Sequence, residues 1–202
     1  MSAIRVMGLL GALLASGTAS AADLVGDGAR GQPLTTLCAA CHGPSGNSVV
    51  PIFPALAGQG ERYLNQQLLH IRDNRRVVPE MAGTLAGFSD QDLLDIASWY
   101  ASQKPTPGEA LAAAPQRGQD LYRSGDLALG LPACSGCHSP NGAGAALAGF
   151  PRLGGQHAPY LIKRLTDFRQ GDDAAAPIMH RIAAKLNDDD IAALAAYIQA
   201  LR

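Results

Sequence analysis

The pentapeptide Cys-x-x-Cys-His occurs twice in the chain, as CAACH over residues 38–42 and as CSGCH over residues 134–138. Two thiols at this spacing can add to the two vinyl groups of one porphyrin, and the adjacent imidazole can then bind the iron. The two copies use all four cysteines of the chain. The sequence therefore predicts two covalently bound c-type haems, held by four thioether cysteines and two iron-binding histidines: Cys38, Cys41, Cys134, Cys137, His42 and His138.

A Cys-x-x-Cys pair also occurs in redox-active dithiols and in zinc sites. A thioredoxin-like dithiol needs a βαβ setting, and the residues that flank the two motifs carry no strand pattern. A zinc site built from both pairs would have to join segments that belong to different repeat units. Haem attachment is therefore the favoured interpretation of both motifs.

Residues 1–22 have the three parts of a secretory signal peptide. Arg5 supplies the positive charge, residues 6–15 form a short apolar core, and Ala19-Ser20-Ala21 matches the cleavage pattern. The apolar run is too short for a comfortable membrane span, so an uncleaved anchor is the less favoured alternative. We therefore expect export to the periplasm, which also suits attachment of haem to reduced cysteines.

The net charge of the mature chain is small. Residues 23–104 contain six basic and eight acidic residues, a difference of minus two, and residues 105–202 contain nine of each. No basic patch of the kind that binds nucleic acid is present. The slight difference between the halves suggests that each half meets a different partner protein.

A sequence repeat divides the chain after the signal segment. FPALAGQ at 53–59 matches FPRLGGQ at 150–156 with an offset of 97. Residues 103–115 (QKPTPGEALAAAP) are rich in Pro, Ala and Gly and lack apolar periodicity, which is typical of a linker. We therefore expect two tandem domains, at 23–104 and 105–202, joined by a linker at about 103–115.

Each half has the periodicity of helices. Residues 61–73 place Leu64 and Leu68 on one face, and the equivalent helix begins at Pro159 with Leu161 and Phe168 turned inward.

Ser89 and Asn187 each stand at the start of a final helix, with acidic residues in the first turn. Short helices are expected near 27–37, where Pro33 predicts a kink or irregular turn, and near 115–123. Because strand patterns are absent, the predicted fold is all-α.

Two methionines remain beyond the signal segment, Met81 and Met179, and they correspond across the repeat at an offset of 98. A methionine usually fills gaps in a core, but the paired positions favour a role as the second axial ligand of each iron. The competing histidines, His70, His157 and His180, do not repeat. His180 is the main rival because it adjoins Met179. His/Met ligation leaves no vacant iron position, which favours electron transfer over catalysis.

Other repeated positions have expected supporting roles. The carbonyls of Pro54 and Pro151 could accept a hydrogen bond from the second nitrogen of each haem-binding histidine. Gly31 and Gly118 could let the last helix of each half approach closely, although a turn role is the simpler interpretation. Two further repeated pairs have expected roles. Leu56 and Leu153 would pack on the porphyrin. Arg72 and Arg169 would either pair with haem propionates or lie solvated at the surface.

The segments CAACHGPSGNS (38–48), GLPACSGCH (130–138) and FPRLGGQHAPYL (150–161), with the run that begins at Met179, resemble the di-haem cytochrome c4 family. The resemblance covers nearly all of the mature chain. It implies two haems with His42/Met81 and His138/Met179 ligation, and haem propionates that face each other across the domain interface. It also implies a periplasmic carrier between a cytochrome bc complex and a terminal oxidase, and it allows loose association with the membrane.

Two features depart from the family pattern. Ser139 follows the second motif where glycine is usual, and Asp172-Asp173 stands where an arginine-containing segment is common. The second departure leaves the relative reduction potentials of the two haems open.

Three functions fit these residues. The leading one is a carrier of single electrons between redox proteins (a terminal oxidase or reductase on the acceptor side), with no small-molecule substrate and no enzymatic activity. The second is the cytochrome subunit of a larger dehydrogenase. The third is an enzyme, either a di-haem peroxidase or a sulfur-compound dehydrogenase, which would need a vacant axial position or a ligating cysteine.

Overall fold

The computed structural model describes residues 24–107, 114–173 and 175–202. The expected signal peptide at 1–22 and much of the expected linker lie outside these residues. No helix among the described residues has the length and apolar character needed to cross a membrane.

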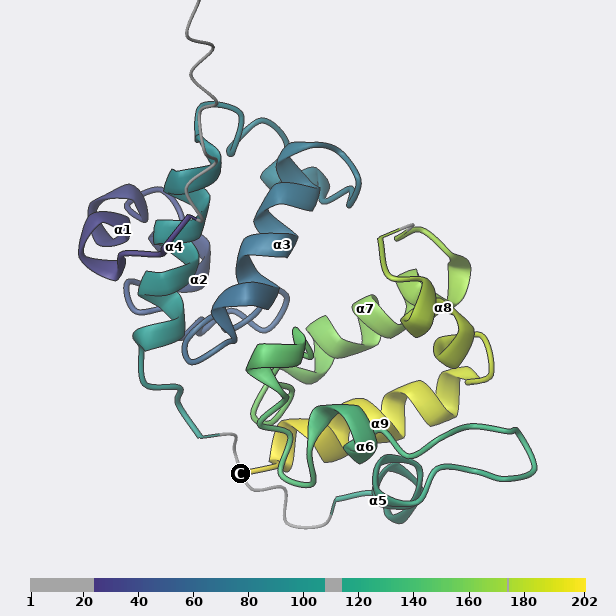
Figure 1. The fold of residues 1–202 in the computed structure, drawn as a ribbon. Helices are drawn as coiled ribbons and strands as arrows, with labels where there is room; N and C mark the ends of the chain where they lie inside the picture. The colour runs from purple at the N-terminus through teal and green to yellow at the C-terminus, as the bar shows by residue number, and fades with distance from the viewer. Residues whose placement is uncertain (1–23, 108–113, 174) are drawn as a thin grey trace, which may run out of the picture.

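Two groups of helices follow each other along the chain (Figure 1). The first group contains α1 (Gly28–Leu34), α2 (Ala39–His42), α3 (Glu61–Arg72), the 3-10 helix η1 (Pro79–Met81) and α4 (Asp90–Ser102). The second contains α5 (Gln116–Arg123), α6 (Ser135–His138), the 3-10 helix η2 (Ala146–Ala148), α7 (Ala158–Gln170), α8 (Pro177–Ala183) and α9 (Asp188–Ala200). Within the described residues, β pairing is limited to isolated bridges, as at Asp126 and Leu131. The prediction of an all-α fold with two tandem domains is confirmed.

The helix ends follow the capping signals in the sequence. The Ser89 side chain accepts from the backbone N–H of Asp92, and Asn187 does the same for Asp190. The helix α1 ends at Leu34, directly after Pro33, and the chain then passes through turns into α2. The predicted irregularity at this proline is therefore confirmed, because a proline inside a helix disrupts the hydrogen bonds of the preceding turn.

The last helix of each half crosses a short helix at a glycine. A Cβ on Gly31 of α1 would collide with the backbone of Asp95 on α4, and a Cβ on Gly118 of α5 would collide with the backbone of Ala193 on α9. The hydrogen in place of a side chain lets the two backbones touch, as the sequence suggested. These crossings pack α1 against α4 and α5 against α9 (Figure 1).

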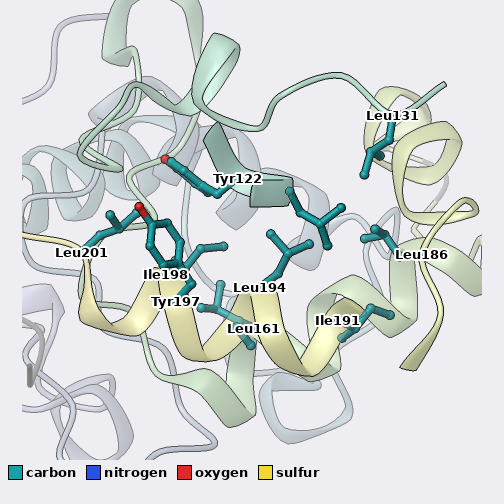
Figure 2. Packing of buried hydrophobic residues seen from close by; sticks show 11 residues of the cluster. Tyr122, Leu131, Leu161, Leu186, Ile191, Leu194, Tyr197, Ile198 and Leu201 are labelled. Carbon is teal, nitrogen blue, oxygen red and sulfur yellow. The ribbon is translucent and has the colours of Figure 1, made fainter. Parts of the chain in front are cut away.

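Each half has its own apolar core beside the crossing. In the second half the core residues extend along α9 and meet Tyr122 of α5 and Leu161 of α7 (Figure 2). In the first half Leu93, Ile96 and Tyr100 of α4 meet Leu64 of α3. Phe168, expected in the second core, instead lies beneath the Arg164 guanidinium, 4.3 Å from the ring centroid.

The repeated arginines Arg72 and Arg169 brace the start of the last helices. Arg72 donates to the Asp90 carboxylate at 2.7 Å, and Arg169 donates to the Asp188 carboxylate at 2.6 Å. Each also donates to the backbone carbonyl before the helix cap, at 3.2 Å in both halves. Both side chains are thus paired within their own half rather than simply solvated. Pairing with a haem propionate stays a prediction.

Asp95 is a buried carboxylate at the crossing of α1 and α4. It accepts from the Asp27 backbone at 2.8 Å, from Arg30 at 2.9 Å and from Gln91 at 2.8 Å. The hydrogen bond from Arg30 is the main reason that the pKa of Asp95 lies below its usual value. Burial opposes this shift, but the donors outweigh it.

We predict that Gly31→Ala destabilises the holoprotein by about 2 kcal/mol, because the added methyl group forces α1 away from α4. Gly87→Ala is the matched control, since nothing lies within 4 Å of a Cβ built on Gly87. Guanidinium unfolding of both variants measures the difference. Equal stability of the two variants would contradict the close crossing.

We predict that Asp95→Asn lowers the stability by about 2 kcal/mol at pH 6, because the charged hydrogen bonds from Arg30 are lost. A carboxyl group with a lowered pKa in the folded state stabilises that state above its unfolded pKa of about 3.9 and loses this contribution as the pH falls further. The gap between the wild-type chain and the variant should therefore shrink below about pH 4. Unfolding at pH 6 and pH 3 tests this, and a gap that is constant with pH would show that Asp95 is not held as a carboxylate.

Candidate functional site: the two haem-attachment motifs

The two motif histidines are oriented by the same hydrogen bond. His42 closes α2, and its Nδ1 lies 2.9 Å from the carbonyl oxygen of Pro54. His138 closes α6, and its Nδ1 lies 3.0 Å from the carbonyl oxygen of Pro151. Since a carbonyl can only accept, each Nδ1 carries the proton. These are the two contacts that the repeated prolines led us to expect.

The opposite nitrogen of each ring is therefore the one that can bind a metal. With the proton on Nδ1, the Nε2 of His42 and of His138 carries a lone pair, and no described residue donates a hydrogen bond to it. Both residues are buried, with 8% and 7% of their surface exposed. Burial lowers the pKa of both imidazoles, which keeps them neutral, the form that binds a metal.

Phe53 and Phe150 hold the two rings from the side. Each phenyl ring meets its histidine edge-on at 6.3 Å between centroids, with interplanar angles of 63° and 62°. Each phenylalanine precedes the proline whose carbonyl accepts from the same histidine. One short segment thus fixes the imidazole by a hydrogen bond and by an aromatic contact.

In the second half, an apolar cavity brings the predicted ligands together. His138 lines it from α6 and Met179 lines it from α8, and the first motif cysteine, Cys134, is also part of its wall. The other lining residues are aliphatic: Leu131, Leu153, Leu165, Ile182, Leu186, Leu194 and Ile198. An apolar wall with one nitrogen donor, one thioether and one thiol fits a covalently attached haem.

The first half places the equivalent side chains against one core cluster. Cys38, Leu56 and Met81 pack on the buried residues of α3 and α4. Met81 ends the 3-10 helix η1, and its carbonyl accepts from the Thr84 hydroxyl at 2.7 Å. Met179 lies instead on the α-helix α8, which Pro177 begins. The two methionines therefore reach repeated positions from different backbone conformations.

The three competing histidines have other surroundings. His180 is exposed, does not line the cavity, and its Nδ1 lies 2.8 Å from the Phe168 carbonyl. The Nε2 of His157 lies 2.9 Å from the carbonyl of Ser48 in the other half. His70 is buried on α3, and burial lowers its pKa.

The cysteines differ in exposure within each motif. Cys38 and Cys134 are half-buried, whereas Cys41 and Cys137 are exposed. Burial raises the pKa of Cys38, and it raises the pKa of Cys134 to about 11. A reactive dithiol has a lowered thiol pKa, so these environments do not favour the redox interpretation. Nor does a zinc site fit, because the two pairs lie in separate halves.

The two departures from the family pattern have local explanations. Ser139 adopts a left-handed φ of 63°, close to the 77° of Gly43, and Tyr122 donates to its carbonyl at 2.7 Å. Asp173 is buried and accepts from Arg164 at 2.7 Å. Ser139 therefore keeps the backbone turn that Gly43 forms in the first half. The buried carboxylate of Asp173 is paired with the Arg164 guanidinium.

The glutamine that ends each FPxLxGQ segment has a role that motif and periodicity do not predict. Gln59 donates to the Arg152 carbonyl at 3.0 Å and accepts from the Arg152 N–H at 2.7 Å. Gln156 donates to the Ala55 carbonyl and accepts from the Ala55 N–H, both at 2.9 Å. Each glutamine thus bonds to the other half. Their repetition at an offset of 97 was the available signal.

Comparisons with known proteins agree with this geometry. The cytochrome c family pattern matches residues 28–104 and again 115–202. The chain is 53% identical to cytochrome c4 of Pseudomonas aeruginosa over 196 residues, which covers 96% of this chain and 98% of that protein. It is 52% identical to cytochrome c4 of Azotobacter vinelandii, with 94% and 96% covered.

Among solved structures, the crystal structure of reduced cytochrome c4 from Pseudomonas stutzeri matches with a TM-score of 0.84 and 51% identity, covering 88% of this chain and all of that one. The chain therefore belongs to the cytochrome c4 family: it is an electron-transfer protein with two tandem cytochrome c domains and two covalently bound haem c groups.

Proposed function

We propose that the protein carries single electrons in the periplasm from a cytochrome bc complex to a terminal oxidase. In this proposal Cys38, Cys41, Cys134 and Cys137 hold the haems, and the axial ligand pairs are His42 with Met81 and His138 with Met179. The domains are those at 23–104 and 105–202. The observation that carries the proposal is the cavity of the second half, whose wall contains both His138 and Met179.

When bound, haem c supplies a one-electron iron couple. The protein residues orient the imidazoles through the proline carbonyls, keep them neutral by burial, and exclude water through an aliphatic wall. With His42 and Met81 or His138 and Met179 as its ligands, a bound haem iron would have no position open to a small molecule. This arrangement supports electron transfer without a substrate-binding step.

We predict that Met179→Ala removes about half of the ferric charge-transfer absorbance that is diagnostic of methionine ligation, and that it creates one iron per molecule that binds carbon monoxide. Met81→Ala should remove the other half. His180→Ala is the control, because its ring contacts Phe168 and does not line the cavity. If His180 were the ligand, Met179→Ala would leave both the band and carbon monoxide binding unchanged, and His180→Ala would instead create the iron that binds carbon monoxide.

Exposed aliphatic side chains close to the motifs in sequence support docking of partner proteins. In the first half Val49 and Ile52 are 90% and 62% exposed, and in the second half Leu127 is 98% exposed. Apolar side chains gathered on a surface commonly mark an interaction site. In this proposal Val49 and Ile52 contribute to the docking contact of one partner and Leu127 to that of the other.

We predict that Ile52→Lys slows electron exchange with one partner complex at least several-fold and leaves exchange with the other unchanged, because it adds a charge to only one surface. Leu127→Lys is the matched variant in the second half and should show the reverse preference. Stopped-flow measurements with purified bc complex and with oxidase test this, with optical spectra as the check on haem integrity. Equal effects on both partners would exclude separate docking surfaces.

A second candidate function is the electron acceptor of a dehydrogenase. The chain is 32% identical to a thiosulfate dehydrogenase electron acceptor of Thiomonas intermedia over 178 residues, covering 85% of this chain and 82% of that protein. A thiosulfate dehydrogenase structure from Marichromatium purpuratum also matches, with a TM-score of 0.76 and 29% identity, over 85% of this chain and 40% of that one. Co-purification of the exported protein with a dehydrogenase, rather than with respiratory complexes, would favour this candidate.

A further inference from the structure

The two glutamine contacts between the halves form a reciprocal pair. Gln156 of the second half holds both backbone polar groups of Ala55, and Gln59 of the first half holds both backbone polar groups of Arg152. Ala55 and Arg152 occupy equivalent positions in the repeat, as the glutamines do. Each domain therefore contacts the other through the same segment and the same four-atom pattern.

The backbone that each glutamine holds is directly joined to the group that orients a histidine. Ala55 follows Pro54, whose carbonyl accepts from His42, and the peptide unit between them contains both that carbonyl and the Ala55 N–H. A peptide unit is planar and rigid. A hydrogen bond from Ala55 N–H to Gln156 therefore fixes the direction in which the Pro54 carbonyl points. The same connection runs from Gln59 through Arg152 to Pro151 and His138.

Each glutamine side chain is itself held in place. Both residues are 7% exposed. The Oε1 of Gln156 also accepts from the N–H of His157 at 3.0 Å, and the Oε1 of Gln59 accepts from the N–H of Gly60 at 3.1 Å. A buried amide with all of these partners has one favoured orientation, because any rotation would leave a polar atom unpaired.

The loop that carries the proline also makes backbone hydrogen bonds within its own domain, and these begin at the residue after Ala55 or Arg152. In the first half the Gly46 carbonyl accepts from Leu56 at 2.7 Å and from Ala57 at 3.0 Å, and in the second half the Gly142 carbonyl accepts from Leu153 at 2.7 Å and from Gly154 at 2.9 Å. These bonds lie after Ala55 and Arg152. Before the proline, the Val50 carbonyl accepts from the Phe53 N–H at 3.0 Å, and Ala145 and Phe150 exchange two bonds at 3.0 and 3.1 Å. Between these points, the N–H of each peptide unit that orients a histidine bonds to the glutamine of the other domain.

We propose that Gln156 is a positioning residue for His42 and that Gln59 is a positioning residue for His138, so that each domain tunes the haem of the other. The inference rests on the proposed axial ligation by these histidines. A hydrogen bond from Nδ1–H to a well-placed carbonyl makes an imidazole a stronger donor to a metal. Loosening the carbonyl should weaken this donation and raise the reduction potential of the haem in the opposite domain.

The test uses the holoproteins Gln156→Met and Gln59→Met. Methionine keeps the length and volume of the side chain but cannot replace the two hydrogen bonds. Other contacts between the halves remain, such as the bond from Arg62 to the Leu147 carbonyl at 3.0 Å and the contact of His157 with Ser48 at 2.9 Å. The two variants serve as matched controls for each other, because each removes the same number of bonds from the same interface.

Two measurements are made on each variant. The first is the reduction potential of each haem, assigned to its domain by the paramagnetically shifted NMR signals of the oxidised protein. Gln156→Met should raise the potential of the first haem and leave the second nearly unchanged, and Gln59→Met should do the reverse. The second measurement is amide exchange in the reduced protein, which should accelerate about tenfold at Ala55 in Gln156→Met and at Arg152 in Gln59→Met.

The outcomes separate the inference from the ligation on which it rests. Equal shifts of both haems, or a larger shift in the domain that carries the substitution, would overturn the positioning role. Accelerated exchange at Ala55 with an unchanged potential of the first haem would also overturn it, because the contact would then be structural only. Failure of the ligation on which it rests has a different signature, since the oxidised wild-type protein would then lack paramagnetically shifted ring signals from His42 and His138.

Discussion

The hydrogen bond from a histidine Nδ1–H to a proline carbonyl is the constraint on which the rest of each domain depends. It fixes the tautomer of His42 and His138 and leaves Nε2 free to bind a metal. To bring the proline over the imidazole, the chain must turn back after the motif, which Gly43 and Ser139 achieve with a left-handed backbone. The returning segment then continues into α3 or α7, which form one wall of the core.

The duplication preserves this constraint more closely than it preserves the chain around it. The two histidine contacts differ by 0.1 Å in length, from 2.9 to 3.0 Å, and the two Phe–His angles by one degree, from 63° to 62°. By contrast, Met81 lies on a 3-10 helix and Met179 on an α-helix. The proximal side of each site is therefore nearly the same, and differences between the two haems would arise mainly on the methionine side and in the surrounding charges.

Local signals in the sequence predicted most of the fold. Some features depend only on residues near in sequence or on a single helix crossing, so periodicity and backbone conformation predict them. These are the caps at Ser89 and Asn187, the irregularity at Pro33 and the close approach at Gly31. The hydrogen bonds that Gln59 and Gln156 make between the domains depend on how the two folded domains pack against each other. The bond from Arg72 to Asp90 was likewise beyond the sequence, since the carboxylate belongs to another helix.

The interface between the domains is consequently part of both haem sites. Each histidine is oriented by a carbonyl whose peptide unit is bonded to the other domain, so neither domain has the same proximal geometry alone. Each glutamine binds the N–H and the carbonyl of one residue, which belong to two successive peptide units. Because the exchange is reciprocal, separation of the domains would release both carbonyls together. The contact between the halves therefore links the orientation of His42 to that of His138.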